Sequence, residues 1–180
     1  VSDVYNFRKT IEHDEKLEEV YQRLAFVLKI NLGITNFNFF EADTVNQKVN
    51  LVYKEKDIYC KATQNGCRAD RTNTVIESSQ FHQVCAECHT DKDYICIPYS
   101  ISNNLDLIIS IYAETEEETK QIKSVIPLIE DYIDAAKTVI VSKKLMSILE
   151  KTANSDALTG LFNRKYLEDS VPQIVSQAKR

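Results

Sequence analysis

Near the beginning of the chain, apolar positions recur with the period of an α-helix and charged positions lie between them. Through residues 3–31, apolar side chains recur at three- and four-residue intervals, with charged side chains between them. This is the pattern of an amphipathic α-helix. Gly33 follows the last apolar positions, and a glycine there is typical of a helix end. The pattern therefore predicts one long N-terminal helix.

The middle of the chain contains short runs rich in Phe, Val, Ile and Tyr, which favour β-strands. Four runs are predicted to be strands: residues 37–42, 48–55, 94–100 and 105–114. Polar residues separate the first two runs, and Asn103 with Asn104 separates the last two. Because asparagine tolerates the positive φ of a tight turn, we expect these asparagines to close a hairpin. The runs thus predict two antiparallel hairpins.

The segment between the hairpins has a different composition. Residues 67–78 predict a short helix, and residues 78–93 are polar enough to predict a loop. With helices before and after the strands, the whole pattern predicts an α+β fold in which an antiparallel sheet is flanked by helices and followed by a long C-terminal helix.

The predicted C-terminal helix begins near Thr115, which has the spacing of a capping box with Glu118. Its apolar positions alternate four- and three-residue steps, as in a coiled-coil seam. The seam residues are Ile122, Ile126, Ile129, Ile133, Ala136 and Ile140. Pro127 is expected to bend this helix or to divide it in two.

Two interpretations of this helix are open. Its first half can cover the sheet as an ordinary amphipathic helix, or it can pair with a second copy. Beyond Ala135 we expect the folded core to be exhausted, while Leu145 and Leu149 continue the apolar seam after a phase shift. We therefore predict a parallel homodimer through the C-terminal helix.

Composition and charge narrow the possible partners. The 180 residues are 43 % apolar, which is enough for an ordinary core. The formal charge is −5 and no basic run matches a row of phosphates, so we predict no nucleic-acid binding. No apolar stretch approaches the roughly 18 residues of a membrane span, so we predict a soluble segment without membrane contact. Because the chain begins with Val1, we expect further segments upstream of it, and a membrane anchor in those segments is an open alternative.

All five cysteines of the chain lie between positions 60 and 96. An odd number of cysteines without a secretory signal argues against a disulfide framework of the secreted type. It favours metal binding or redox chemistry in a reducing compartment.

A metal site is the first interpretation of these cysteines. Cys85 and Cys88 are spaced so that two thiolates can bind one ion from a single turn, and Cys67 begins the predicted short helix, where free N–H groups favour a thiolate. Cys60 is the predicted fourth ligand of a tetrahedral site, with His89 in reserve. Such a site suits zinc, iron or an iron-sulfur cluster.

Other interpretations of the cysteines remain open. A thiol-disulfide sensor would use Cys85 with Cys88 or with Cys67. A structural zinc site and unliganded thiols are further alternatives, and the CAECH sequence has the form of a c-type haem attachment site. Cys96 alternates with isoleucines in a predicted strand, so we expect it to pack as a small apolar residue.

Residues 155–171, SDALTGLFNRKYLEDSV, closely resemble the opening of the GGDEF domain family. The signature of that family is Asp-x-Leu-Thr-Gly-Leu-x-Asn-Arg, followed by an aromatic residue and a leucine. The matching residues are Asp156, Leu158, Thr159, Gly160, Leu161, Asn163, Arg164, Tyr166 and Leu167. Core packing alone would not demand Asn163 and Arg164 at this spacing.

This resemblance implies that the full protein is a diguanylate cyclase, which joins two GTP molecules into cyclic di-GMP with Mg²⁺. The catalytic Gly-Gly-Asp/Glu-Glu-Phe signature is absent from these residues, so we expect this segment itself not to be an enzyme. A supply of GTP implies a cytoplasmic location. The part upstream of a GGDEF domain is usually a sensor.

The body of the chain resembles a GAF domain, with a PAS domain as the structural alternative. The resemblance lies in the succession of helix, antiparallel sheet, short helix with loop, and exit helix, and in the hairpin YICIPYSISNNLDLIISIYAET. We therefore predict three parts: a GAF-like sensor in residues 1–116, a signalling helix in residues 117–154, and the start of a GGDEF domain in residues 155–180. The predicted function is control of cyclic di-GMP synthesis through the cysteine-rich site. The alternatives are a thiol-disulfide sensor and a dimerisation module with structural zinc.

Overall fold

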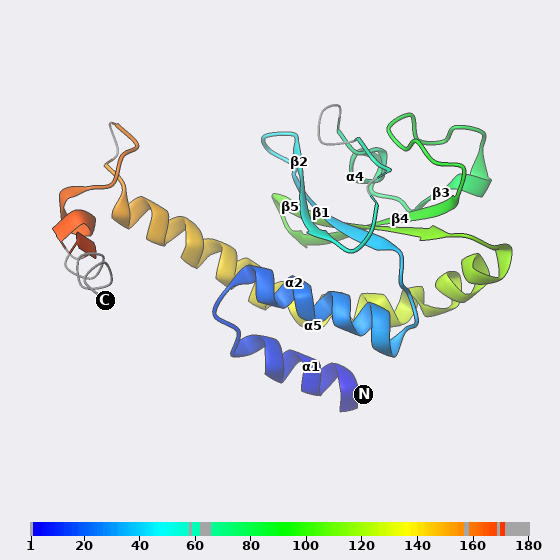
Figure 1. Cartoon of the computed structure of the whole chain (residues 1–180), viewed down its shortest axis with the longest axis horizontal. Coiled ribbons are helices and arrows are strands. Elements are labelled where there is room, and N and C mark those ends of the chain that lie inside the picture. The colour runs from blue at the N-terminus through cyan, green and yellow to red at the C-terminus, as the bar shows by residue number, and fades with distance from the viewer. Residues whose placement is uncertain (1, 58, 62–65, 157–158, 169, 172–180) are drawn as a thin grey trace, which may run out of the picture. The chain divides into compact units, whose positions relative to one another are not determined.

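The computed structural model describes residues 2–57, 59–61, 66–156, 159–168 and 170–171 of the chain (Figure 1). They form two compact units, residues 1–141 and 142–180, which are described separately. The elements in chain order are α1 (Ser2–Glu12), α2 (Leu17–Phe26), the π-helical turn η1 (Val27–Asn31), β1 (Phe37–Asp43), β2 (Lys48–Lys54), α4 (Arg68–Thr72), β3 (Ile76–Glu77), the 3-10 turn η2 (Ser78–Gln80), β4 (Asp93–Ser102), β5 (Leu105–Ala113) and α5 (Glu116–Asn154).

The first unit is built on one five-stranded sheet. Its strand order is β2-β1-β5-β4-β3, and all neighbours are antiparallel. The two predicted hairpins are β1-β2 and β4-β5, and β5 pairs with β1 to join them. The prediction of an α+β fold with an antiparallel sheet and a long C-terminal helix is confirmed.

The sheet separates two apolar clusters because side chains alternate between its faces along each strand. On β5, Leu107, Ile109 and Ile111 belong to a large cluster that includes residues of α1, α2 and α5. Ile108 and Tyr112 belong to a second cluster, which contains residues of α4 and of the loops. Figure 1 shows the same division, with α2 and α5 on one side of the sheet and α4 on the other.

The prediction of a single helix over residues 3–31 is wrong. The chain breaks between α1 and α2, where both oxygens of the buried Asp14 accept from Arg23 Nε at 2.8 Å. The Glu19 carboxylate caps the new helix by accepting the N–H groups of Glu15 and Lys16 at 2.7 and 3.0 Å. The break lets α1 fold back, so that Phe7 joins the apolar cluster of the helix-covered face.

The segment after Cys67 is helical over a shorter range than predicted. Helix α4 ends at Thr72, because Asn73 adopts a left-handed conformation with φ of 48°. Ile76 and Glu77 then pair with β4 as the edge strand β3. The predicted polar loop that follows is confirmed apart from the short turn η2.

The β4-β5 hairpin closes differently from the prediction. Asn103 and Asn104 form the turn, but among the described residues neither has a positive φ. The strand register instead shifts between Ser100 and Ser102, which places one extra residue in β4. Such a bulge increases the local twist and lets an ordinary turn close the hairpin.

Helix α5 begins as the sequence predicts. The Glu118 N–H donates to Thr115 Oγ1 at 3.2 Å, while the Glu118 carboxylate accepts from Glu114 N at 2.7 Å. The helix runs to Asn154 without a division at Pro127, so that alternative is wrong. Ile129 and Ile133 are fully buried in the cluster of the helix-covered face, which favours the sheet-covering role for the first half of the helix.

The core extends further along α5 than predicted. Ala136, Val139 and Ile140 are still buried in the cluster of the helix-covered face, so the expectation that the core ends at Ala135 is wrong. Part of the reason is that α1 also covers this helix. The Phe7 ring contacts the Tyr132 ring edge-on, with 5.2 Å between the ring centroids.

The second unit contains the end of α5 and a compact turn built by the GGDEF-like residues. The Asp156 side chain accepts from the N–H and the hydroxyl of Thr159 at 2.9 and 2.8 Å, and Gly160 supplies a φ of +70°. The Asn163 amide donates to Ala153 O at 2.5 Å, and its oxygen accepts from Tyr166 N at 2.9 Å. Asn163 therefore caps the end of α5 and the start of the helix at residues 164–168. Leu158 of the motif lies outside the described residues.

Candidate functional site

The five cysteines converge on the face of the sheet that the long helices do not cover. Cys60, Cys67, Cys85 and Cys96 are buried members of its apolar cluster, and the partly buried Cys88 packs against them. We call these five residues the cysteine layer. The segments that contribute them are the strand β4, the start of α4 and two loops. The predicted convergence of cysteines distant in sequence is thus present in the structure.

Cys60 and Cys88 face each other across an isolated antiparallel bridge. Their neighbours make two backbone hydrogen bonds that frame the bridge: Lys61 N to Glu87 O at 2.8 Å and His89 N to Tyr59 O at 2.9 Å. The flanking residues, rather than the cysteines, exchange these bonds. This is the non-hydrogen-bonded type of pair, in which opposed side chains lie closest together.

Cys67 lies at the N-cap of α4, as predicted from the sequence. Burial raises the pKa of its thiol, although the N–H groups of Asp70 and Ala69 act in the opposite direction. The two amides therefore favour a thiolate, as expected for this helix end, but the cost of burying a charge exceeds their effect.

Cys85 and Cys88 belong to one turn, in which Cys88 N–H donates to Cys85 O at 3.3 Å. Burial and, to a smaller extent, the neighbouring Cys60 and Cys85 raise the pKa of Cys88 to about 12. At neutral pH the Cys88 thiol is therefore protonated.

Cys96 packs as a small buried residue, as predicted. It is 7 % exposed, pairs with Ile76 across the sheet, and its sulfur lies 3.3 Å from Ser110 Oγ. Burial raises its pKa well above the ordinary value, and nearby Cys67, Cys60 and Cys88 add to this. Its position in the sheet brings it to the same layer as the four predicted ligands.

Tyr112 is a residue of this layer that the sequence analysis did not single out. It is 3 % exposed, and its hydroxyl has no hydrogen-bond partner among the described residues. Burial raises its pKa, the neighbouring Cys96, Cys88 and Cys60 add to this, and the Ser110 side chain acts in the opposite direction. The ring contacts Tyr59 edge-on at 4.9 Å. The sequence of β5 contains no signal for this face, because every position of the strand is buried.

The layer does not have the arrangement of a formed metal centre. Within the described part of the chain, no group of three or more His, Cys, Asp or Glu side chains is disposed to hold a metal ion. The reserve ligand His89 is exposed. The four predicted ligands Cys60, Cys67, Cys85 and Cys88 share one layer, so zinc, iron or an iron-sulfur cluster at this place stays a prediction.

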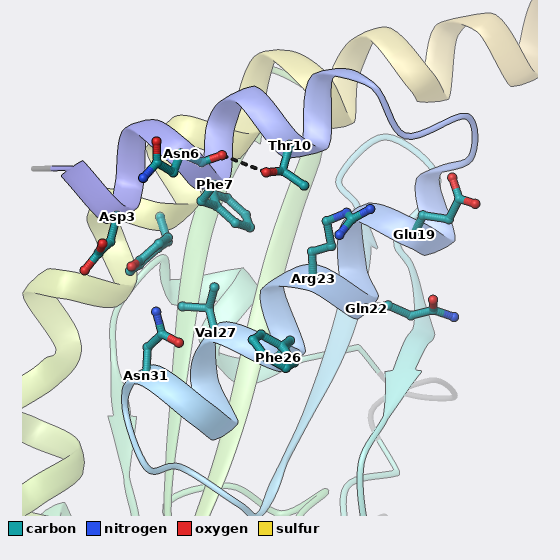
Figure 2. Close-up of a pocket in the computed structure, with 11 residues that line it drawn as sticks. Asp3, Asn6, Phe7, Thr10, Glu19, Gln22, Arg23, Phe26, Val27 and Asn31 are labelled. Carbon is teal, nitrogen blue, oxygen red and sulfur yellow. Dashed lines mark hydrogen bonds between the residues drawn. The ribbon is translucent and has the colours of Figure 1, made fainter.

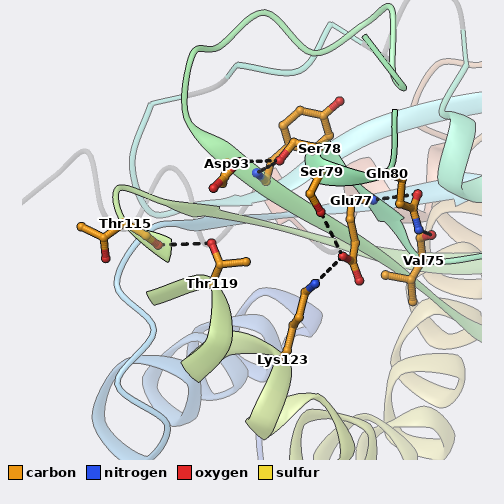
Figure 3. Close-up of polar contacts among 10 residues, drawn as sticks. Val75, Glu77, Ser78, Ser79, Gln80, Asp93, Thr115, Thr119 and Lys123 are labelled. Carbon is orange, nitrogen blue, oxygen red and sulfur yellow. Dashed lines mark hydrogen bonds and ion pairs between the residues drawn. The ribbon is translucent and has the colours of Figure 1, made fainter. Parts of the chain in front are cut away.

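Both ends of the cysteine-bearing loop are held by side-chain contacts (Figure 3). Ser78 Oγ donates to Asp93 Oδ1 at 2.9 Å and accepts from Tyr94 N at 3.1 Å, which joins the first and last residues of the loop. Glu77, just before the loop, forms an ion pair with Lys123 of α5 at 2.6 Å. The loop that carries Cys85 and Cys88 is therefore connected to the long helix.

A separate groove of about 650 Å³ lies on the helix-covered side of the first unit (Figure 2). It is lined mainly by α1 and α2, including Asn6, Phe7, Gln22 and Phe26, and by Tyr132 of α5. No cysteine lines this groove, so it is distinct from the predicted sensing site.

No protein-family model and no curated protein matches the chain. Among solved structures, the chain is similar to a crystal structure of residues 122 to 287 of a methyl-accepting chemotaxis protein. The similarity covers 81 % of this chain and 99 % of that one, with a TM-score of 0.51 and 14 % sequence identity. At this identity the similarity is one of fold. No helix in the described residues is both long and apolar enough to cross a membrane.

Proposed function

We propose that this chain is the regulatory sensor region of a diguanylate cyclase, in which the cysteine layer senses a signal and α5 transmits it. Two observations support the signalling role. Residues 155–171 resemble the start of a GGDEF domain. The similar solved structure is a fragment of a methyl-accepting chemotaxis protein.

The observation that carries this proposal is that the cysteine layer and α5 pack against opposite faces of the same sheet. Along β5, Ser110 contacts Cys96 and Tyr112 belongs to the cluster of the cysteine layer, while Ile109 and Ile111 pack in the cluster that includes α5. A change among the thiols can therefore reach α5 through the strands, which are closely packed and transmit strain. Allosteric coupling of about 1 to 3 kcal/mol changes an output severalfold.

The Glu77–Lys123 ion pair supports a second route for the signal. It joins the residue before the cysteine-bearing loop to α5 at 2.6 Å, and Glu77 Oε2 also accepts from Ser79 Oγ at 3.4 Å. Movement of the loop would change this contact and hence the position of α5. We propose that the helix passes this change to the downstream cyclase domain.

The end of α5 supports a parallel homodimer. Leu145, Met146, Ile148 and Leu149 are each more than half exposed, although they are large and apolar. A second copy of the same helix is the occupant that fits this stripe, because the residues keep the three- and four-residue spacing of a coiled-coil seam. Two cyclase domains must meet to join two GTP molecules, so a dimer also suits the proposed output. A dimerisation module without sensing is the second candidate function that this stripe favours.

The nature of the sensed agent is a further part of the proposal. If a metal binds, Cys60, Cys67, Cys85 and Cys88 would hold it as thiolates, and zinc or iron suits such ligands. Because the described side chains are not disposed as a metal centre, no step of the proposed signal is assigned to a metal.

The proposal is tested with the full-length protein by measuring cyclic di-GMP formation from GTP in reducing and in oxidising buffer. We expect the rate to differ severalfold between the buffers, and the difference to vanish when Cys60, Cys67, Cys85 and Cys88 are all changed to serine. His82→Ala is the matched control, since His82 is an exposed residue of the same loop. Absence of cyclic di-GMP formation would overturn the cyclase assignment. An unchanged response in the serine variant would favour the dimerisation module.

A further inference from the structure

Cys60 and Cys88 differ from the other cysteines in their mutual geometry. We infer that these two residues form a modification site, at which a small-molecule disulfide converts their thiols into an intramolecular disulfide bond. The sequence alone suggested Cys85 with Cys88 or with Cys67 as the oxidisable pair. The regulatory meaning of the bond rests on the proposed function, but its formation does not.

The backbone geometry favours this bond. The two cysteines occupy a non-hydrogen-bonded antiparallel position, framed by bonds of 2.8 and 2.9 Å between their neighbours. At such a position the Cα atoms lie about 4.5 Å apart and the two side chains project from the same side. A disulfide requires Cα atoms about 4.4 to 6.8 Å apart and Cβ atoms about 3.5 to 4.5 Å apart. The bond therefore needs only a small approach of the two side chains.

The other cysteines are less well placed for a bond. Cys85 and Cys88 are three residues apart in one turn, which already closes through the 3.3 Å backbone bond between them. Cys96 is held within the sheet, beside Ser110 and opposite Ile76. Cys67 is a neighbour of Cys85, but it lies at the start of α4 and no β-bridge places it opposite another cysteine. None of these three shares the direct opposition of Cys60 and Cys88.

Access to the pair is provided by Cys88, the one cysteine that is not fully buried. In the first step the Cys88 thiolate attacks one sulfur of the small-molecule disulfide and releases one small thiol, leaving a mixed disulfide. In the second step Cys60 attacks the Cys88 sulfur and releases the second small thiol. Cys60 and Cys88 together lose two electrons and two protons, and the reagent gains both as two thiols.

The bond would change the cysteine layer in two ways. It would fix residues 59–61 covalently to residues 87–89, which are otherwise joined by two backbone hydrogen bonds. It would also remove two of the four predicted metal ligands. Under the proposed function, oxidation of this pair is the event that the loop reports to α5.

The sequence allows the bond to be located without ambiguity. Cleavage after Lys and Arg places Cys60 in residues 57–61, Cys67 in residues 62–68, and Cys85 with Cys88 in residues 72–92. A second protease that cleaves after Glu separates Cys85 from Cys88 at Glu87. The native chain is incubated with glutathione disulfide at a series of increasing alkaline pH values, because burial keeps Cys88 protonated at neutral pH and its thiolate fraction grows as the pH rises. Remaining thiols are alkylated, and the peptides are identified by mass spectrometry.

The expected result is a cross-link between peptide 57–61 and the fragment that contains Cys88, with the other three thiols alkylated. Cys88→Ser should abolish the cross-link, and Cys67→Ser should retain it. A cross-link between Cys85 and Cys88 or between Cys67 and Cys85 would overturn the inference. So would complete alkylation of all five thiols, or stable glutathione adducts without an internal bond.

Two features keep the test decisive. The wild-type map stands on its own if a variant fails to fold, and circular dichroism identifies such a variant. Chain unfolded before oxidation should give a mixture of pairings, whereas native chain should give one. The map requires no GTP and no cyclase activity, so its failure is distinguishable from failure of the proposed function.

Discussion

The two faces of the sheet are covered in different ways. On one face, apolar side chains of β1, β4 and β5 pack with residues of α1, α2 and α5 in one large cluster. On the other, a smaller cluster is closed by loops, the five-residue helix α4 and the cysteine layer. Long helices supply a rigid cover, whereas loops make fewer regular contacts and open more easily. Stability is therefore expected mainly from the first face and responsiveness from the second.

The two faces are expected to differ most in the stability that is lost when a buried side chain is shortened. Two adjacent isoleucines of β5 test this difference. Ile109 is 0 % exposed on the helix-covered face, and Ile108 is 1 % exposed on the cysteine face. We expect Ile109→Ala to lower the free energy of unfolding by about 4 kcal/mol and Ile108→Ala by about 2 kcal/mol, because loops relax into a cavity more readily than helices. Urea denaturation of both variants measures this. Equal losses would mean that the two covers are equally rigid.

Two buried tyrosines sharpen the comparison. Tyr21 donates to Glu41 Oε1 at 2.5 Å on the helix-covered face, whereas the Tyr112 hydroxyl has no partner among the described residues. Tyr21→Phe should lower the free energy of unfolding by about 1.5 to 3 kcal/mol, since a hydrogen bond to the Glu41 carboxylate is lost. Tyr112→Phe should leave stability unchanged or raise it. A substantial loss in Tyr112→Phe would show that its hydroxyl is bonded in solution.

Alkaline pH is expected to lower the stability of the folded chain through Cys88 on the cysteine face. The pKa of Cys88 rises from its ordinary 9.0 to about 12 in the folded chain, because of burial and the neighbouring Cys60 and Cys85. The folded state therefore holds this proton more tightly, and its stabilising effect is complete below pH 9 and lost as pH rises towards 12. The urea midpoint should fall over this range, and less steeply in Cys88→Ser. Parallel curves for the two proteins would contradict the assignment.

The smallest expected effect concerns the contact between the loop and α5. Lys123→Ala removes the partly exposed ion pair with Glu77 and should cost less than about 1 kcal/mol. Lys120→Ala is the matched control, because Lys120 pairs with Glu116 within α5 itself. Hydrogen exchange of residues 78–92 should accelerate in Lys123→Ala only. Equal exchange in both variants would mean that the ion pair does not hold the loop.

The strands and α5 could be predicted because their signals are local. Alternating apolar runs identified β1, β2, β4 and β5, and Thr115 with Glu118 marked the start of α5. The break before α2 could not be predicted from the periodic pattern of apolar positions. It depends on side-chain contacts such as the Asp14–Arg23 ion pair, which that pattern does not contain.

The candidate site could be predicted only in part. The clustering of cysteines in sequence indicated a common place, and the structure brings Cys60, Cys67, Cys85 and Cys88 into one layer. The opposition of Cys60 and Cys88 could not be predicted, because it depends on a bridge between two loops with no strand pattern of their own. The place of Tyr112 depends on which face of β5 meets the helices, which the sequence of that strand leaves ambiguous.

The short edge strand β3 has a consequence for behaviour at high concentration. It pairs only Ile76 and Glu77 with β4, and the pairing ends before Pro98. Proline has no N–H to offer a neighbouring strand, so this border is a poor template for strand addition from another molecule. At high concentration, edge-to-edge aggregation is therefore disfavoured at the β3 edge of the sheet.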